Sequence, residues 1–358
     1  MIVVRFDNVM TIDNIPMWPG VRYVVSEDMA QTMINQGIRG NVKLTHHSGF
    51  NNFERRLRPE AAKEGDIVAI WRHNAFGDNL MVTGLVAYMK LVLKLRVHVI
   101  CAPHVMPVWL GMDKSIRPDA LLPTPVYFDA AANFYDWHVF YQAMLEENRE
   151  PDQICAVDDL WQFAGFDKDT RGTTKNFRRP LIKQTPLGRG EGIGISLHSG
   201  NCTRTMPIKW TADLITALYK KFPNRKIHVF GLDAKMGEEL DSYRLPVSNY
   251  TGKISFEKTM EIMEQQVGTM ISPDSALLHL AEGLGIPNIG LWGLFNPNDR
   301  TEHYRYHTGI SNFSACPHAP CRWHGMNKFP EDKCGVLQVP NHCNALSSIP
   351  IEKVVEAV

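Results

Sequence analysis

The sequence predicts an α/β protein with two Rossmann-like domains that face one another across a cleft. Apolar strands alternate with helices from Asp66 onward, and a second alternation of the same kind begins at Gly192. Continuous apolar strands separated by helices are typical of a parallel sheet that is covered on both faces. The length of 358 residues also agrees with two domains of about 150 residues each.

The apolar runs predict individual strands and helices. In the first domain a strand at 67–71 is followed by a helix at 80–94 and a strand at 96–101. The helix is apolar beyond one face, so we expect it to be buried. In the second domain the expected elements are a strand at 192–197, a helix at 211–222, a strand at 226–231, helices at 234–243 and 255–265, a strand at 269–272, a helix at 275–284 and a strand at 288–292.

Changes in composition divide the chain into four parts. A strand at 22–25 and a helix at 27–36 precede a polar and basic stretch, so we interpret the first residues as an appended extension. A polar stretch at 167–190, interrupted by Pro and Gly, reads as the linker between the domains. The expected parts are an N-terminal extension at 1–64, a first Rossmann-like domain at 65–180, a second at 181–345 that includes a cysteine cluster at 316–343, and a C-terminal helix at 346–358.

The charge balance disfavours some classes of protein. Lys and Arg together number 38, and Asp and Glu together number 38, so the chain has no net charge when histidine is neutral. Without a long-range positive field, bulk binding to nucleic acid or to anionic membranes is not expected. The N-terminus has no basic and apolar leader, and no apolar run reaches the roughly 18 residues that span a bilayer. We therefore expect an ordinary soluble enzyme of the cytoplasm.

The loop HNAFGD, after the first strand of the first domain, is a candidate ligand-binding loop. In parallel sheets a ligand lies beyond the carboxyl ends of the strands, where helix N-termini offer unpaired N–H groups to anions. Gly77 permits a tight turn, and Asp78 projects at the start of the apolar helix. The alternative is that Asp78 is only a helix N-cap, a position that Asp favours.

The loop HSGNCTRTMPIKW, in the second domain, has the side chains that a diphosphate requires. Hydroxyl and amide groups supply donors for the phosphate oxygens, and two cations compensate their charge. We expect Thr211 to cap the helix that follows. The alternative is an ordinary exposed loop. The candidate ligands are Ser199, Asn201, Thr203, Arg204, Thr205 and Lys209.

A third loop, SPDSALLHLAEGLGIP, places Asp274 and Ser275 at a helix start, with His279 one turn further. This arrangement suits recognition of a ribose or a base. The alternative for His279 is a satisfied side chain in the core. No G-x-G-x-x-G follows a strand and no Walker A sequence occurs, so nicotinamide or flavin dehydrogenases have little support.

Four of the seven cysteines lie in the last quarter of the chain, with the spacing C-x4-C-x12-C-x8-C. Close thiols in a reducing compartment bind metal more often than they form disulfides, so a structural zinc or iron is the leading interpretation. Unligated thiols, disulfides and redox chemistry are the alternatives, and none of them makes the cluster catalytic. The candidate ligands are Cys316, Cys321, Cys334 and Cys343, with His318, His324 or His342 as a replacement for one sulfur.

In their order along the chain, these motifs resemble those of the heptosyltransferase-like glycosyltransferases, the ADP-heptose:lipopolysaccharide heptosyltransferase family with the GT-B fold. The resemblance runs from about Asp66 to the C-terminus. Asn79 and Ala276 depart from the family pattern, which usually has an apolar residue and a glycine there. The matching parts are Gly77-Asp78, the polar loop ending in Lys209-Trp210, YTGKISFEKTMEI at 250–262, DSALLHLAEGLGIP at 274–287, LWGLFNPNDR at 291–300, the C-terminal cysteines and the helix IPIEKVVEAV.

The resemblance implies an inverting transfer of a heptose-like sugar from a nucleotide-diphosphate donor, of the ADP-heptose kind, to an acceptor hydroxyl, with no cofactor for catalysis. The first domain would bind the acceptor and supply Asp78 as the general base. The second domain would hold the donor, and its cationic and backbone donors would stabilise the departing diphosphate. In that domain Lys209 and the 199–205 loop would face the diphosphate, and Asp274, Ser275 and His279 would lie near the sugar and the nucleoside.

Several alternatives stay open. The acceptor is a saccharide, a protein or a nucleobase, and the cysteine cluster supports a protein, because some protein heptosyltransferases of this family carry a metal-binding cysteine set. A non-catalytic nucleotide-sugar-binding module is the alternative outside enzymes. Residues 1–64 have no counterpart in the simplest family members, which points to a different acceptor or to a contact within a homo-oligomer.

Overall fold

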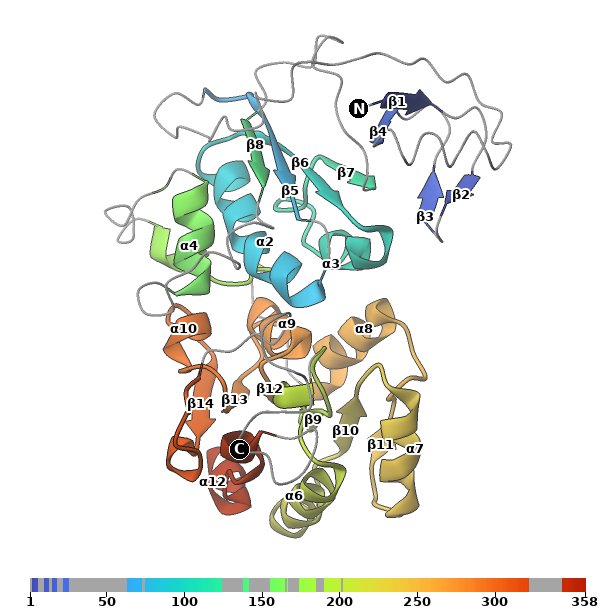
Figure 1. Cartoon of the computed structure of the whole chain (residues 1–358), viewed down its shortest axis with the longest axis vertical. Helices are drawn as coiled ribbons and strands as arrows, with labels where there is room; N and C mark the ends of the chain where they lie inside the picture. The colour runs from blue at the N-terminus through green and yellow to red at the C-terminus, as the bar shows by residue number, and fades with distance from the viewer. Residues whose placement is uncertain are drawn as a thin grey trace.

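The chain forms two lobes, each built on a parallel β-sheet (Figure 1). In this computed structural model the described residues are 2–5, 10–12, 15–17, 22–25, 63–72, 75–123, 138–141, 155–164, 166, 174–184, 190–200, 202–321 and 343–358.

The N-terminal lobe has a four-stranded sheet in the order β7-β6-β5-β8, with every strand pair parallel. Helix α2 is buried along most of its length, as its apolar sequence predicts. The strands are β5 (Ile67–Trp71), β6 (Arg96–Cys101), β7 (Ala120–Pro123) and β8 (His138–Tyr141), and the helices are α2 (Phe76–Leu91), α3 (Met106–Leu110) and α4 (Ala156–Phe163).

The C-terminal lobe has a six-stranded parallel sheet in the order β11-β10-β9-β12-β13-β14. Numbered along the chain this is the order 3-2-1-4-5-6 of the dinucleotide-binding Rossmann sheet, and it reverses between β9 and β12. The strands are β9 (Gly192–Ser196), β10 (Ile227–Phe230), β11 (Ser248–Asn249), β12 (Val267–Pro273), β13 (Asn288–Trp292) and β14 (His307–Ser311). The helices are α6 (Ile208–Lys221), α7 (Ala234–Ser242), α8 (Phe256–Gln266), α9 (Ala276–Leu284), α10 (Asn298–Thr301), α11 (Asn344–Ser347) and α12 (Ile351–Ala357).

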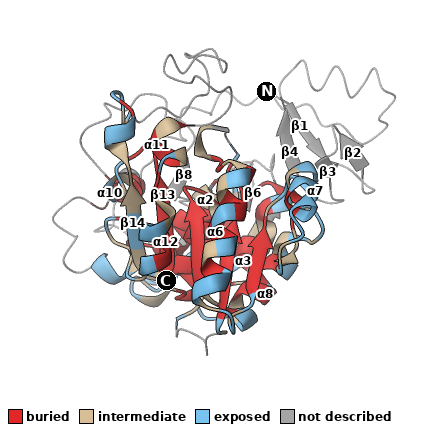
Figure 2. Ribbon diagram, turned by 90° about the horizontal axis from the view of Figure 1, so that it is seen from below, coloured by how far each residue is buried: buried red, intermediate tan, exposed pale blue. Residues whose placement is uncertain are grey.

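Helix α6 illustrates how the sequence fixes the packing of this lobe. Its buried residues Ile208, Thr211, Ala212 and Ile215 recur at helical spacing, so one face packs inward and the outer face is exposed (Figure 2). The C-terminal helix α12 packs against α6. The C-terminal helix therefore belongs to the packing of the C-terminal lobe.

Residues 177–184 run between the lobes and bond to both. Leu181 N donates to Thr83 Oγ1 on α2 (2.8 Å), and Ile182 N donates to Gly283 O on α9 (3.0 Å). Residues 178–182 of the predicted linker are therefore buried, although the sequence of the linker is polar. One cluster of buried apolar side chains continues from the strands of the N-terminal lobe to α8 and α9, so the two lobes share a core.

Most predicted elements are confirmed, and two helix starts are wrong. Helix α2 begins at Phe76, four residues before the predicted start at 80. The strands at 67–71, 96–101 and 288–292 have the predicted bounds. Helix α6 begins at Ile208, three residues before the predicted start, with Pro207 at its N-cap. Thr211 therefore lies inside the helix, where its hydroxyl donates to Pro207 O (3.3 Å). Pro at the N-cap replaces the hydroxyl cap that the sequence pattern predicted.

In the extension, β1 (Ile2–Arg5) pairs with β4 (Arg22–Val25) and β2 (Met10–Ile12) pairs with β3 (Ile15–Met17), both antiparallel. The predicted strand at 22–25 is confirmed, whereas the predicted helix at 27–36 lies outside the described residues. Within the described ranges, no helix combines the length and apolar character that crossing a membrane requires.

Candidate active site

The candidate site lies where the strand order of the C-terminal sheet reverses. The loops after β9 and β12 leave neighbouring strands there, and this is the ligand-binding position of an open α/β sheet. The loop after β9 contains Ser199, Thr203, Arg204 and Thr205, and the loop after β12 contains Asp274 and Ser275.

Asp274 is the centre of a buried ionic cluster. Arg204 Nη1 donates to Asp274 Oδ2 (3.0 Å) and to Asp274 O (3.1 Å), and His279 Nε2 lies 3.6 Å from Asp274 Oδ1. Burial alone would raise the pKa of Asp274, but the charges of Arg204 and Arg300 and the hydrogen bond from His279 hold it well below its usual range. Asp274 is thus a carboxylate that fixes Arg204 at the end of β12.

His279 lies in the first turns of α9 and joins this cluster to Tyr304. Its Nδ1 is 2.6 Å from the Tyr304 hydroxyl. Burial raises the pKa of Tyr304 well above its ordinary value, so the phenol is neutral. The alternative of a core histidine is correct as far as burial goes, since His279 is 3% exposed. Its contact with Asp274 nevertheless places it beside the site.

The start of α9 offers a binding place for an anion. The first N–H groups of a helix have no intrahelical partner and carry its positive dipole end. Ser275 occupies the N-cap without making a side-chain cap bond. Its hydroxyl instead lies 2.8 Å from Ser272 Oγ and 3.5 Å from Ser196 Oγ. Three hydroxyls therefore gather beside a helix N-terminus.

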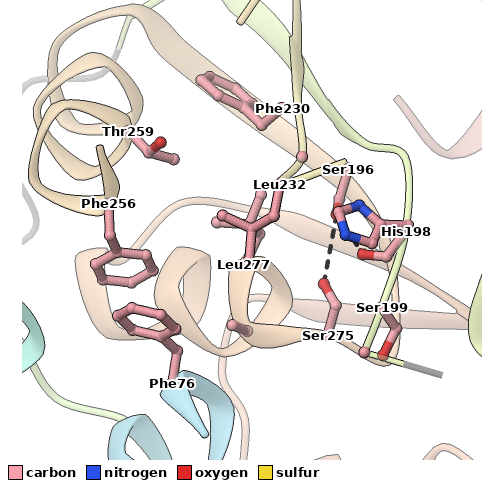
Figure 3. A pocket seen from close by; sticks show the side chains of 13 residues that line it. Phe76, Ser196, His198, Ser199, Phe230, Leu232, Phe256, Thr259, Ser275 and Leu277 are labelled. Atoms are coloured by element: carbon pink, nitrogen blue, oxygen red, sulfur yellow. Dashed lines mark hydrogen bonds between the residues drawn. The ribbon is translucent and has the colours of Figure 1, made fainter. Parts of the chain in front are cut away.

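A cavity of about 120 Å³ opens beside these hydroxyls (Figure 3). Phe76 of α2 stacks on Phe256 of α8 at one side, with ring centroids 4.1 Å apart and an angle of 19° between the planes. The cavity therefore has an apolar side, at the rings, and a polar side, at the hydroxyls. Its lining residues are Phe76, Ser196, His198, Ser199, Gly200, Phe230, Gly231, Leu232, Phe256, Thr259, Ser275, Ala276 and Leu277.

His198 supplies a polar group to the cavity. Its Nδ1 is buried and has no hydrogen-bond partner in the described part of the chain. Burial lowers the pKa of His198, although Asp233 opposes the shift. The ring is therefore neutral near pH 7, and its Nδ1 can form a hydrogen bond with a ligand.

Asp78 lies in the first turn of α2, on the side of the N-terminal lobe that meets α9. Arg72 Nη2 donates to Asp78 Oδ2, and the Asp78 side chain is 23% exposed. Ala75 occupies the N-cap position, so the alternative that Asp78 is the N-cap is wrong. A Cβ placed on Gly77 would lie 3.1 Å from His279 Cδ2 and 3.6 Å from Ala276 Cα. The first turns of α2 and α9 are therefore in contact.

The other residues predicted to face the diphosphate differ in their burial and in their distance from the site. Ser199 and Thr205 are buried and bond to each other through Ser199 N and Thr205 Oγ1 (3.4 Å). Thr203 is half-buried, and Asn201 lies outside the described residues. Lys209 is not brought into the site, because its side chain is 76% exposed and its ammonium bonds to Asp213 on the same helix (2.8 Å). Its position in the first turn of α6, a consequence of the earlier helix start, directs it to solvent.

Three of the four predicted metal-ligating cysteines are described. Cys316 and Cys343 are buried, and Cys321 is exposed. Burial raises the pKa of Cys343, and the neighbouring Cys321 and Cys316 add to the rise, so the three thiols share one region. Cys334, His324 and His342 lie outside the described residues.

Several residues of the site were not predicted from the sequence. Arg72 follows a strand directly and could have been found by the rule that ligands gather at strand ends. His198 begins the second loop and could have been found in the same way. Phe76, Phe256 and Tyr304 carry no such signal, because their roles arise from contacts between segments far apart in the chain.

The comparisons with known proteins agree with this geometry. The sequence profile of glycosyltransferase family 9 (heptosyltransferase) matches residues 226–326. The match covers 101 of the chain's 358 residues. It extends from β10 beyond β14 and includes Asp274, Ser275 and His279, so the resemblance to the heptosyltransferase-like glycosyltransferases is confirmed and glycosyltransferase activity is supported. A search of curated protein sequences found no match.

Solved structures share the fold of this chain. An ADP-heptose LPS heptosyltransferase II of E. coli aligns with a TM-score of 0.56 at 14% identity, covering 82% of this chain and 97% of that one. A glycosyl transferase family 9 protein of Veillonella parvula aligns with a TM-score of 0.55 at 13% identity, covering 83% and 97%. The dodecameric iron-containing heptosyltransferase TibC, in complex with ADP-D-beta-D-heptose, aligns with a TM-score of 0.51 at 12% identity, covering 84% and 78%. The fold is GT-B.

Proposed function

We propose that the chain is an inverting glycosyltransferase that moves a heptose-like sugar from a nucleotide-diphosphate donor to an acceptor hydroxyl. The contact between the first turn of α2 and the first turn of α9 carries this proposal. A carboxylate from one lobe, Asp78, and an anion-binding helix start from the other therefore flank one space. The family 9 match, which includes α9, supports the same reading.

The donor occupies the C-terminal lobe in this proposal. The apolar side of the cavity, with Phe230 and Phe256, suits the flat face of a nucleobase, and neutral His198 offers it a hydrogen bond. The diphosphate lies at the start of α9, beside Ser275 and Arg204. A donor of the ADP-heptose kind is suggested by the ligands named for the solved heptosyltransferases.

Asp78 acts as the general base. The acceptor oxygen attacks the anomeric carbon and forms the new glycosidic bond while its proton passes to Asp78. The bond from the anomeric carbon to the diphosphate breaks on the opposite face, and the diphosphate leaves with the electron pair, which inverts the configuration. Arg72 holds the Asp78 carboxylate in position through its hydrogen bond.

The leaving diphosphate gains negative charge as its bond to the sugar breaks. Arg204 is held against Asp274 at the end of β12, so its guanidinium needs little reorganisation to accept the developing charge. The positive dipole end of α9 adds to this stabilisation. This chain's own residues thus supply the base and the electrostatic stabilisation, and no cofactor is required for the step.

Incubation of the purified chain with ADP-heptose, an ADP-hexose and a UDP-hexose tests the proposal. We expect slow release of ADP from ADP-heptose without acceptor, and faster release with a saccharide, protein or nucleobase acceptor that the enzyme uses. Binding of the donor with neither hydrolysis nor transfer would instead show a non-catalytic binding module. The anomeric configuration of the product, measured by NMR, would contradict the mechanism if it were retained.

We propose further that the cysteine tail holds one structural zinc or iron through Cys316, Cys321, Cys334 and Cys343. The shared region of the three described thiols supports this reading, and TibC is an iron-containing heptosyltransferase of the same fold. Thiolates are preferred ligands of both metals. A metal-containing tail is consistent with a protein acceptor. The dodecameric assembly of TibC is consistent with a homo-oligomer.

Cys321→Ser tests the tail. Its side chain is exposed, so the substitution costs little packing. We expect the variant to lose about one equivalent of tail metal and to melt at a lower temperature, because the binding energy of a structural metal contributes to folding. Elemental analysis and thermal unfolding measure the two effects, and unchanged metal content would contradict the site.

A further inference from the structure

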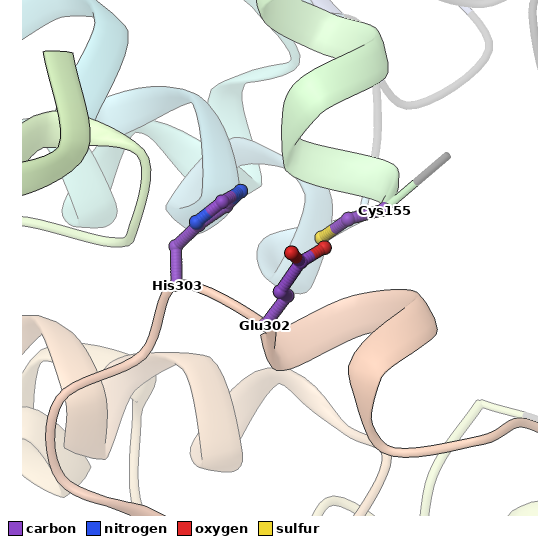
Figure 4. Close-up of side chains that lie close together, drawn as sticks. All are labelled: Cys155, Glu302 and His303. Carbon is purple, nitrogen blue, oxygen red and sulfur yellow. The ribbon is translucent and has the colours of Figure 1, made fainter. Parts of the chain in front are cut away.

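A group of metal-ligating side chains lies away from the candidate active site, at the contact between α4 and α10. Cys155, Glu302 and His303 each place one ligand atom within 4.8 Å of the others (Figure 4). Cys155 directly precedes α4 in the N-terminal lobe, and Glu302 and His303 directly follow α10 in the C-terminal lobe. The group therefore spans the two lobes.

We propose that Cys155, Glu302 and His303 form a zinc site that links the two lobes. A sulfur, a carboxylate and an imidazole together are a ligand set of zinc, and three protein ligands leave a fourth position for water or substrate. Their mutual spacing allows one ion to contact all three after small side-chain rotations. The site is separate in sequence and in ligands from the cysteine tail.

Asp158 provides the orienting contact that a metal-bound histidine needs. Its Oδ1 lies 2.8 Å from His303 Nε2 and 2.6 Å from Arg178 Nη1, and its side chain is fully buried. Ligating histidines commonly bond to a carboxylate through their second nitrogen, which fixes the ring and raises its basicity. The Asp158 contact occupies Nε2, so in this proposal Nδ1 of His303 is the nitrogen that binds the metal.

The next residue along the chain connects this zinc site to the candidate active site. Tyr304 follows His303, and its hydroxyl lies 2.6 Å from His279 Nδ1. His279 in turn contacts Asp274, which fixes Arg204. A metal that immobilises Glu302 and His303 therefore also restrains Tyr304, and we expect it to tighten donor binding through His279. This second part rests on the proposed function.

Zinc titration of the full chain, with a competing chelator, tests the site with the metal alone. The background is Cys321→Ser, so that the tail does not contribute. We expect one zinc equivalent per chain in this background and its loss in Cys155→Ser. Glu302→Gln should weaken zinc binding by at least about tenfold. Because Glu302 is exposed, Glu302→Gln still tests the zinc site if Cys155→Ser fails to fold.

Glu238→Gln on α7 is the matched control, because Glu238 is also an exposed glutamate of the C-terminal lobe but belongs to no group of three potential metal ligands among the described residues. It should bind zinc as the background does. Equal zinc affinity in Glu302→Gln and Glu238→Gln would overturn the site.

Binding of ADP, measured with and without zinc, tests the link to His279. Zinc should tighten ADP binding in the Cys321→Ser background but not in Glu302→Gln. Zinc binding without any change in ADP affinity would overturn that link and leave the proposed transferase activity untouched.

Discussion

Arg204 and Lys209, two cations predicted for the same loop, differ in their surroundings. The Arg204 side chain is 18% exposed and bonds to buried Asp274, whereas that of Lys209 is 76% exposed and bonds to Asp213 on the surface. An exposed ion pair of this kind contributes little and is screened by salt. Arg204 is consequently the cation that a diphosphate would find already in position.

We predict that Arg204→Ala weakens binding of a nucleoside diphosphate by about tenfold to a hundredfold, since a charge-assisted hydrogen bond contributes about 1.5 to 3 kcal/mol. Binding of the nucleoside alone should change little, because the base cavity is lined by other residues. Lys209→Ala serves as the control and should bind both ligands normally. Isothermal calorimetry measures both affinities. An equal loss for nucleoside and diphosphate would point to a disturbed fold in place of a lost phosphate contact.

Asp78→Asn should preserve donor binding and reduce turnover by about 10² to 10⁴-fold, the usual contribution of a general base. The amide keeps the size of the side chain but cannot take the acceptor's proton. Asp213→Asn, on the exposed face of α6, is the control and should keep full turnover. Turnover and donor affinity are measured separately, and near-normal turnover in Asp78→Asn would reject the assignment.

At the scale of elements, the edge strand β14 is fixed to β13 by a neutral histidine. Trp292 Nε1 donates to His307 Nε2 (3.3 Å), and His307 Nδ1 lies 2.7 Å from Asn288 Oδ1. Nε2 accepts, so Nδ1 carries the proton and donates to Asn288. Burial lowers the pKa of His307 to about 4. Protonation would place a second N–H against the indole N–H and break this arrangement.

We predict that acid weakens the β13–β14 contact through His307. The pKa is about 4 in the folded chain and about 6.5 when unfolded, so the unfolded state takes up the proton first. The contribution of neutral His307 to the free energy of unfolding is therefore complete above about pH 6.5. It declines by up to about 3 kcal/mol as the pH falls toward 4. His307→Gln keeps a donor and an acceptor but cannot titrate, so its unfolding free energy should fall less over this range. Parallel pH profiles of the two proteins would contradict the role of His307.

Elements that depend on local pattern were predicted well from the sequence. Strands β5, β6 and β13 are short apolar runs bounded by turn residues, and their bounds match the prediction. Helix α6 departs from its predicted start. A hydroxyl cap at Thr211 is a strong local signal, but burial of Ile208 against the sheet extends the helix back to Pro207. Tertiary packing overrides the cap preference here.

The candidate site was predicted in part, for a physical reason. Asp274, Ser275 and Arg204 come together because the rule for strand ends in a parallel sheet is local and general. The partner of Gly77 is His279, about two hundred residues later in the sequence, and the partner of Phe76 is Phe256. Those contacts depend on how one lobe sits on the other, which neither periodicity nor spacing specifies.

At the scale of the whole molecule, the two lobes are held by the segment between them. Gly84 of α2 faces this segment so closely that a Cβ would overlap the carbonyl oxygens of Phe177 and Arg179. Both obstacles are backbone atoms, which cannot rotate away as a side chain can. The absence of a side chain at Gly84 is therefore what allows α2 and the linker to pack together.

Gly84→Ala should destabilise the whole protein by about 1 to 3 kcal/mol, the range for an extra group forced into a packed interior. We expect both lobes to be affected together, because the linker also bonds to α9 through Ile182 N. Gly200→Ala is the control for stability, since a Cβ at Gly200 meets no atom within 4 Å. Thermal or denaturant unfolding measures the difference. Equal stability of the two variants would show that the linker shifts freely.

The stack of Phe76 on Phe256 bears on the order of events in a catalytic cycle. The cavity beside it holds about 120 Å³, whereas pockets for drug-sized ligands measure about 300 to 1,000 Å³. We therefore expect the two rings to part when the nucleobase of the donor enters this cavity. Phe76 begins the helix that carries Asp78, so parting the rings also withdraws the base. A dependence of kcat on solvent viscosity would report this gating, and a kcat unaffected by viscosity would argue against it. The donor would load with the catalyst disengaged, and the spent diphosphate would escape only when the lobes separate again.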